Sequence, residues 1–176
     1  MYASQNGLLA HTTLSGINDG WAYNDFGEQV FYAASYNSTA LYETRFTRDH
    51  LGRITHQKEI LQGKTTTYDY SYDEAGRLWQ VHIDGLLAST YLYDANGNRL
   101  SYTSPSGTLS ATYDDQDRML TYGEASYTYT ANGELLTKTE NGKTTTYAYD
   151  ELGNLLEVIL PDGTQIKYLV DGLNRR

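Results

Sequence analysis

The chain has 176 residues, within the usual size range of a single domain. Its formal net charge of −9 argues against nucleic-acid binding, which needs a basic surface. It contains no cysteine, which excludes disulfides and cysteine-based metal sites, and it has no apolar run near the ~20 residues of a membrane-spanning helix.

The N-terminal part of the chain shows no clear pattern. Residues 1–20 lack a positively charged start followed by an apolar core, so no signal peptide is visible. We expect an irregular N-terminal or capping segment at 1–22, followed by a regular region at 23–176.

A motif of the form Tyr-Asp-x-x-Gly-(Asn/Arg)-Leu recurs through this regular region. From Tyr72 onward, its first positions are separated by 21, 20, 16, 20 and 19 residues, which fits hairpins of variable length better than identical solenoid rungs. About eight units are present, and the best matched lie within 63–176. Their first residues are Tyr23, Arg48, Tyr72, Tyr93, Tyr113, Tyr129, Tyr149 and Tyr168.

The last complete unit shows what each copy is predicted to build. Residues 144–149 are β-branched or aromatic and favour a strand, in which Tyr147 and Tyr149 share one face. Asp150 can bond its own backbone two residues on, and Gly153 accepts a positive φ without steric cost. The motif therefore predicts a turn between two antiparallel strands.

A second, tighter turn joins each unit to the next. In the last unit, residues 155–160 and 164–169 are predicted as strands on either side of such a turn. Asn-Gly and Asp-Gly between alternating runs are strong hairpin signals, and no stretch has a helical period. The predicted fold class is all-β: a continuous antiparallel meander of hairpins that forms a twisted, curled ribbon. The predicted tight turns lie at Gln62-Gly63, Asp84-Gly85, Ser106-Gly107, Asn141-Gly142 and Asp162-Gly163.

The motif residues are the candidate structural residues. We expect the Tyr on a strand face, the Asp and Gly in the turn, and the Leu re-entering the sheet. The set comprises Tyr72, Asp73, Gly76, Arg77, Leu78, Tyr93, Asp94, Gly97, Asn98, Leu100, Tyr113, Asp114, Tyr129, Gly133, Tyr149, Asp150, Gly153 and Leu155.

The recurring motif resembles the YD repeat of the RHS and teneurin families over about residues 23–176. In that family, YD repeats form a ribbon of hairpins that spirals into a hollow shell, which encloses a C-terminal toxin in bacterial members. The resemblance implies a non-enzymatic scaffold, a section of shell that is secreted or at the cell surface in its parent protein. Its partners would be the rest of the shell and an enclosed toxin domain. The family's Asp-Pro-x-Gly-Leu segment is absent, so we expect shell without cargo.

Catalytic and metal sites are not indicated. The histidines at 11, 50, 56 and 82 lack zinc-ligand spacing, and no Gly-x-Ser-x-Gly elbow is present. Asp94, Asn96 and Asn98 match the first three ligands of a calcium loop, but Arg99 stands where Gly is required and Pro105 where Glu is required. We expect no catalytic residue, metal or cofactor.

Other charged residues also have turn explanations. The cluster of Asp114, Asp115 and Asp117 reads as a solvated turn, and Asp69 and Asp73 read as strand and turn residues rather than an acid–base pair. Arg77, Arg99 and Arg118 follow three motif turns, and each is predicted to pair across strands with a neighbouring Asp.

Two further hypotheses accompany the scaffold interpretation. Aromatic hairpins of this length also occur in carbohydrate-binding repeats, so a carbohydrate-binding or adhesion module of a bacterial surface protein is the alternative. An open ribbon leaves unpaired edge strands, which predicts self-association through the sheet edges.

Overall fold

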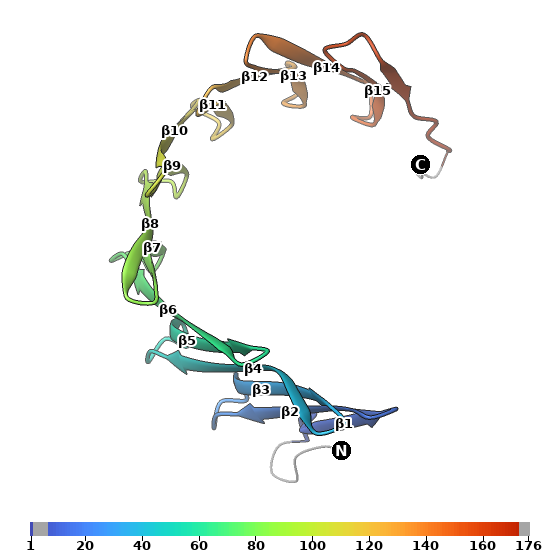
Figure 1. Cartoon of the computed structure of the whole chain (residues 1–176). Helices are drawn as coiled ribbons and strands as arrows, with labels where there is room; N and C mark the ends of the chain where they lie inside the picture. Colours follow the sequence, from blue (N-terminus) through green and yellow to red (C-terminus); the bar gives the residue numbers. More distant parts are fainter. Residues whose placement is uncertain (2–6, 173–176) are drawn as a thin grey trace. The chain divides into compact units, whose positions relative to one another are not determined.

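A computed structural model describes residue 1 and residues 7–172. Within these residues, all regular structure is β: sixteen antiparallel strands follow one another in chain order in one open sheet (Figure 1). The predicted all-β antiparallel meander is confirmed. The strands are β1 His11–Leu14, β2 Ile17–Tyr23, β3 Gln29–Tyr36, β4 Thr39–Arg48, β5 Ile54–Leu61, β6 Lys64–Tyr72, β7 Leu78–Ile83, β8 Leu86–Tyr93, β9 Arg99–Ser104, β10 Gly107–Tyr113, β11 Met119–Tyr122, β12 Ala125–Tyr129, β13 Leu135–Glu140, β14 Lys143–Tyr149, β15 Leu155–Ile159 and β16 Gln165–Lys167.

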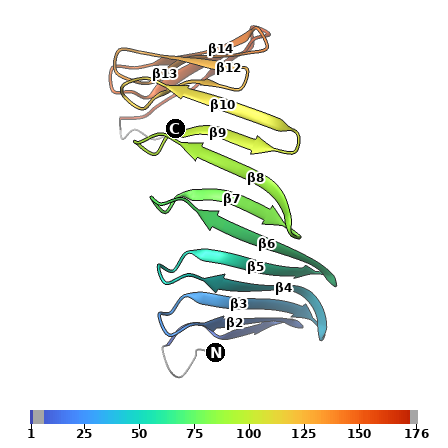
Figure 2. The same ribbon diagram turned by 90° about the vertical axis from the view of Figure 1, so that its left-hand side faces the viewer.

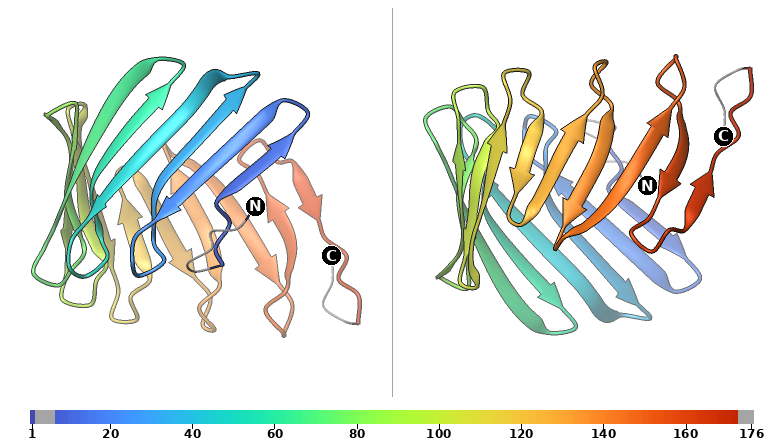
Figure 3. Two further views of the ribbon diagram at one scale, coloured as in Figure 1. Left: turned by 90° about the horizontal axis from the view of Figure 1, so that it is seen from below. Right: turned by 90° about the horizontal axis from the view of Figure 1, so that it is seen from above.

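The chain divides into two compact units. Unit 1 comprises Met1–Tyr91 with Ser104–Ser106, and unit 2 comprises Leu92–Thr103 with Gly107–Arg176. Figure 3 shows the hairpins of unit 2 side by side in its right-hand view.

Two kinds of turn alternate along the chain. In unit 1, the longer motif turns lie at one end of the strands and the tight turns lie at the opposite end (Figure 2). The tight turn between β5 and β6 has positive φ at both residues, 49° at Gln62 and 84° at Gly63. Glycine adopts a φ like that of Gly63 at low steric cost because it has no Cβ. Asp84-Gly85 and Asn141-Gly142 also have positive φ at both residues, at the tight turns that the sequence predicted.

Two predicted tight turns differ in detail. The turn before β10 lies at residues 105–106, one position earlier than predicted, and Gly107 already belongs to the strand. At Asp162-Gly163, Leu160 N–H donates to Thr164 O at 2.9 Å, and Gly163 N–H donates to Leu160 O at 2.9 Å. These bonds close a loop like the motif turns rather than a two-residue hairpin. The flanking strands β15 and β16 are accordingly shorter than predicted.

The N-terminal segment contains regular structure. Part of the segment predicted as irregular or capping forms the hairpin β1–β2, in which His11 pairs with Gly20 and Leu14 with Ile17. Residues 2–6, also part of that prediction, lie outside the described residues. The domain boundary near residue 22 stays a prediction.

A β-bulge follows the motif turns. At Tyr72 the register shifts so that this residue faces Leu78 directly, and the same shift occurs at Tyr113 and Tyr149. One extra residue on the returning strand raises the local twist of an antiparallel pair. Each motif turn with this shift therefore bends the ribbon in the same way.

The sheet has two different faces. One face, here called the ring face, carries Trp21, Tyr32, Tyr42, Tyr68 and Tyr70 in unit 1, because cross-strand partners point to the same side. In unit 2 we give the same name to the face that carries Tyr127, Tyr147 and Val158. The opposite face of unit 2, here called the threonine face, carries hydroxyl pairs at 2.6–2.9 Å. They are Thr112 with Thr121, Thr128 with Thr137, and Thr139 with Thr144.

The core is thin. Among the described residues, only Thr44, Ser89, Ala111, Ala125 and Val158 are buried. Small side chains in the middle of a single-layer sheet are covered by their larger neighbours, whereas the rings themselves stay half-buried. Hydrophobic burial is therefore spread along the ribbon and not concentrated in one centre.

Candidate functional site

The recurrent site is the motif turn, and the turn at 73–77 shows its construction. Asp73 N–H donates to Arg77 O at 2.9 Å, and Gly76 N–H donates back to Asp73 O at 2.9 Å. The Asp73 carboxylate then accepts Arg77 N–H at 2.8 Å on Oδ1 and the Arg77 Nε–H at 2.7 Å on Oδ2. Gly76 has φ 82°, so a side chain there would be strained.

The other turns repeat this pattern. Asp49, Asp94, Asp114 and Asp150 each accept, on Oδ1, the backbone N–H groups two and four residues on, at 2.8–3.0 Å. The motif tyrosines at 72, 93, 113, 129 and 149 are the last residues of their strands, and Leu78 and Leu155 are the first residues of β7 and β15. The candidate glycines Gly97, Gly133 and Gly153 adopt φ between 80° and 98°. Leu100 lies in β9 and is 39% exposed.

The first and fifth residues of each turn have complementary polarity. Asp150 accepts from the Asn154 amide at 2.9 Å, just as Asp114 accepts from Arg118 Nε at 2.7 Å. Where the fifth residue is an acid, the first is a donor. Asn24 Nδ2 donates to Glu28 Oε2 at 2.7 Å, and Thr130 Oγ1 donates to Glu134 Oε2. The departures from Asp in the repeat thus compensate for Glu at the fifth position.

These bonds hold the turn carboxylates ionised. The Arg77 backbone N–H lowers the pKa of Asp73, and the Arg118 backbone N–H lowers that of Asp114. The Asn98 amide lowers the pKa of Asp94, and the Asn154 amide lowers that of Asp150. Both oxygens of these carboxylates serve the turn, which leaves the Asp94 loop with a structural explanation.

The arginines pair differently from the sequence prediction. Arg77 and Arg118 each bind the Asp that opens their own turn, at 2.7 Å. Arg99 lies over the Tyr122 ring, with its guanidinium carbon 5.6 Å from the ring centroid. The five-residue loop brings the side chain of its fifth residue next to that of its first residue, and the spacing in the sequence did not reveal this.

The motif tyrosines link consecutive turns. Tyr72 Oη donates to Ile54 O at 2.6 Å, Tyr113 Oη to Arg99 O at 3.1 Å and Tyr129 Oη to Met119 O at 2.7 Å. Each acceptor is the first residue after the preceding motif turn. This hydroxyl contact, which sequence reasoning missed, ties each of these turns to the one before it.

Arginine side chains complete the same links. Arg53 lies 4.5 Å from the Tyr72 ring centroid, and Arg118 lies 5.0 Å from that of Tyr129. Each guanidinium thus holds the Asp of its own turn and covers the ring of the next unit.

The N-terminal segment takes part in this series. Tyr23 Oη donates to Leu9 O at 2.9 Å, and Gly7 has φ 70°. Gly7-Leu8-Leu9 therefore ends like a motif turn. In the sequence, the signal for this turn was a Gly followed two positions later by a Leu, but Ala3 stands at the position of the motif Tyr.

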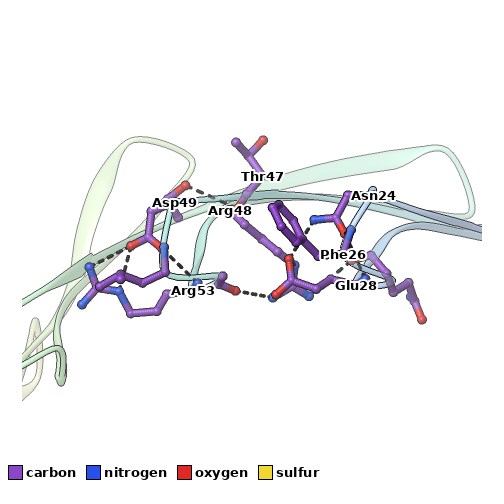
Figure 4. Close-up of polar contacts among 11 residues, drawn as sticks. Asn24, Phe26, Glu28, Thr47, Arg48, Asp49 and Arg53 are labelled. Carbon is purple, nitrogen blue, oxygen red and sulfur yellow. Dashed lines mark hydrogen bonds and ion pairs between the residues drawn. The ribbon is translucent and has the colours of Figure 1, made fainter.

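Arg48 replaces the motif Tyr in one unit and makes the equivalent contact. Its Nη2 donates to Gln29 O at 3.3 Å, the first residue after the preceding turn, and its Nη1 donates to Gly52 O at 2.7 Å (Figure 4). Its Nε lies 3.9 Å from Glu28 Oε2 and, within the described residues, is buried without a hydrogen-bond partner.

A groove of about 490 Å³ lies beside Arg48, in unit 1. Phe26 and Leu51 form its exposed walls, 89% and 76% accessible, and Glu28 and His50 also line it. Arg48 contributes a polar floor to this groove in the place where other units have a ring.

The acidic cluster at 114–117 is also part of the turns. Asp117 occupies the position of the motif Gly and has φ 59°, a conformation that Asp tolerates better than most residues. Its Oδ1 accepts the Asn96 amide at 2.8 Å and the Asn98 amide at 2.6 Å. Asp117 therefore connects its own turn to the preceding one.

The remaining candidates do not form a reactive group. His56 Nδ1 lies 2.7 Å from Asp69 Oδ1 across β5 and β6, whereas Asp73 lies in the turn, so Asp69 and Asp73 serve different contacts. No group of three or more His, Cys, Asp or Glu residues that could hold a metal occurs in residues 1 and 7–172. In the same residues, no helix is long and apolar enough to cross a membrane.

Comparison with solved structures shows a shared fold. A crystal structure of TcdB2-TccC3 matches with a TM-score of 0.72 and 14% identity, over 90% of this chain and 10% of that chain. A second, TcdB2-TccC3 without its hypervariable C-terminal region, matches with a TM-score of 0.70 and 15% identity, over 86% of this chain and 9% of that one.

Sequence comparison identifies the family. Teneurin-3 of Mus musculus is 38% identical over 82 residues, and Teneurin-4 of Homo sapiens is 34% identical over 102 residues. These segments are 43% and 54% of this chain, but only 3% of each relative. The family model described as Teneurin YD-shell matches residues 1–176. Because this match spans the whole sequence, the chain belongs to the teneurin YD-shell family.

Proposed function

We propose that the chain is a non-enzymatic wall section of a hollow shell that encloses a polypeptide, such as a toxin domain. The observation that carries the proposal is the ring face. In both units it presents half-buried tyrosines, and no second layer of described residues covers it. The same face also carries Asp19, Glu59 and the Lys138–Glu140 ion pair, so it is a mixed aromatic and polar surface, and uncovered rings of this kind commonly take part in contacts.

The contacts between consecutive turns are consistent with a section of an extended shell. Tyr72, Tyr113 and Tyr129 each bond the turn before their own, so each unit is stabilised by its neighbour and not by a distant core. Proteins held together in this way can be extended by adding units. The rest of the shell would be the main partner of the chain, in a parent protein that is secreted or at the cell surface.

The enclosed partner is supported by the structural neighbours. One of them is described as lacking its hypervariable C-terminal region, and a region of this kind is what we propose that a shell encloses. In the present chain, the threonine face of unit 2 is polar and pairs its own hydroxyl groups. The ring face, whose half-buried tyrosines combine apolar area with hydroxyl groups, is therefore the surface that we assign to contact with an unfolded or partly folded polypeptide.

Site-specific crosslinking in the full parent protein tests this proposal. A photoreactive benzoylphenylalanine at position 147 would lie on the ring face, and the same group at the neighbouring exposed position 148 would lie on the opposite face. We expect crosslinks to an enclosed segment from Tyr147→benzoylphenylalanine and none from Ala148→benzoylphenylalanine. Equal crosslinking from both positions, or crosslinking from 148 alone, would refute the assignment.

The carbohydrate-binding alternative has weaker structural support. Sugars stack on free ring faces, but guanidinium groups already cover the rings of Tyr72, Tyr129 and Phe31 at 4.5–5.0 Å. Trp79, at 42% exposure, is a ring that a sugar could still reach. Binding on a glycan array that disappears with Trp79→Ala would favour this alternative.

A further inference from the structure

Three rings of unit 1 form a continuous series on the ring face. The Trp21 and Tyr32 centroids are 5.3 Å apart, and the Tyr32 and Tyr42 centroids are 6.0 Å apart, with interplanar angles of 43° and 48°. The rings come from neighbouring strands β2, β3 and β4. All three are half-buried, so solvent reaches them.

Both tyrosines in this series donate to carboxylates. Tyr32 Oη donates to Asp19 Oδ1 at 2.8 Å, and Tyr42 Oη donates to Glu59 Oε2 at 3.1 Å. Thr12 Oγ1 holds the other oxygen of Asp19 at 3.0 Å. The bond to Asp19 raises the pKa of Tyr32, and burial raises the pKa of Tyr42, so both phenols stay protonated donors at neutral pH.

This geometry couples electron loss to proton loss. A phenol that loses one electron becomes a strong acid, and an aligned carboxylate takes its proton without rearrangement, as a general base does. We propose that Tyr32 and Tyr42 form an oxidative modification site, at which a one-electron oxidant joins their rings into a dityrosine cross-link between β3 and β4.

The chemistry balances with two equivalents of oxidant. Each phenol gives one electron to the oxidant and its hydroxyl proton to Asp19 or Glu59, which leaves two neutral phenoxyl radicals. The radicals couple through the ring carbons beside the oxygens, and each ring then moves its displaced hydrogen to oxygen and regains aromaticity. The product has one new carbon–carbon bond and two hydrogen atoms fewer than the starting chain, and the carboxylates release their protons to water.

A second ring pair in the same unit provides a matched control. Tyr68 and Tyr70 stack at 6.4 Å with an interplanar angle of 9°, a separation close to that of Tyr32 and Tyr42. Tyr70 Oη, however, donates to the amide oxygen of Gln57 at 3.1 Å, and an amide is a far weaker base than a carboxylate. Ring proximity is similar in the two pairs, but the proton acceptor differs.

The test is brief photo-oxidation of the dilute, folded chain with ruthenium tris(bipyridine) and persulfate. Dityrosine is detected by its fluorescence, and mass spectrometry follows the loss of two hydrogen atoms. Chymotrypsin cleaves after Tyr36 and Leu41, which lie between the two rings, so a Tyr32–Tyr42 cross-link joins two separate peptides. We expect this joined pair as the main intramolecular product, ahead of any Tyr68–Tyr70 product.

Three variants separate the proposal from general ring oxidation. Tyr42→Phe should abolish the joined peptides, and Tyr70→Phe should leave their yield unchanged. Glu59→Gln keeps an oxygen acceptor for Tyr42 but removes the base, and should slow the cross-link at least about tenfold, since positioned bases contribute roughly 100-fold or more to proton transfer. The circular dichroism spectrum confirms that each variant is folded. Equal yields from the two pairs, an unaffected Glu59→Gln variant, or only intermolecular dityrosine would overturn the proposal.

Discussion

Restoring the motif aspartate at Thr130 should destabilise the chain. Thr130 Oγ1 donates to Glu134 Oε2, and Glu134 N–H donates to Thr130 Oγ1 at 3.2 Å. Thr130→Asp replaces a donor by a second carboxylate beside Glu134. Two unit charges about 4 Å apart repel by roughly 1–4 kcal/mol at effective dielectric constants between those of water and a protein surface. Because the turn is only half-buried, we expect a loss of about 1–2 kcal/mol.

The compensating change should reverse this effect. Adding Glu134→Arg to Thr130→Asp builds the Asp–Arg pair that the Asp73 turn contains at 2.7 Å. The double variant should recover at least the stability of the original chain, whereas Glu134→Arg alone should not gain stability. The four chains form a double-mutant cycle that isolates the interaction of the two side chains.

Urea unfolding and amide hydrogen exchange measure the cycle. Exchange at Gly133 and Glu134 reports the turn itself, because their N–H groups donate to Thr130 O and Thr130 Oγ1. High salt should reduce the penalty of Thr130→Asp by screening. The complementarity argument is refuted if Thr130→Asp is as stable as the original chain, or if the second substitution adds nothing to the first.

Three further predictions address the links, the charges and the edges. Tyr72→Phe removes the hydroxyl that donates to Ile54 O and should cost about 1 kcal/mol in urea unfolding, while Tyr36→Phe, at the 50% exposed end of β3, should have no effect; equal losses would contradict the role of the link. The folded-state pKa values of Asp73 and Asp114 lie below the ordinary 3.8, so the stability they provide is complete above that pH and is lost as the pH falls through the lower folded values. Circular dichroism during acid titration should show this loss, and Asp73→Asn should reduce it; an unchanged acid transition in that variant would count against it. β1 and β16 are the terminal strands of the sheet, and among the described residues no further strand pairs with their outer sides, so the isolated chain should self-associate. Light scattering that gives a monomer mass at all concentrations would be inconsistent with this.

The sequence was most informative where one residue type is required by backbone geometry. Gly76 and the Gln62-Gly63 pair need positive φ, so the residue types alone mark the positions of these turns. Strand positions followed from alternating rings and β-branched residues, as at 144–149. The family resemblance rested on the same residues and is confirmed by the match over the whole chain.

Contacts between units were not predictable in this way. The Tyr72 hydroxyl and its acceptor Ile54 O are 18 positions apart, and the acceptor is a backbone atom, so no side-chain pattern records it. Arg48 appeared as a missing Tyr, although its guanidinium reaches the equivalent carbonyl of Gln29. Different side chains can satisfy one backbone acceptor, and only their positions in space reveal the equivalence.

The sequence by itself thus determined a ribbon of hairpins with a turn at each motif, because turn chemistry and strand alternation act over a few residues. Only the tertiary structure decided which atoms join one turn to the next, and that the Asp–Arg pairs close within a turn. The bulge at Tyr72 was also decided there, because register depends on how two strands fit together. Turn and strand preferences within a few residues determine the structure of each hairpin, whereas contacts between residues far apart in the sequence determine how neighbouring hairpins bind one another.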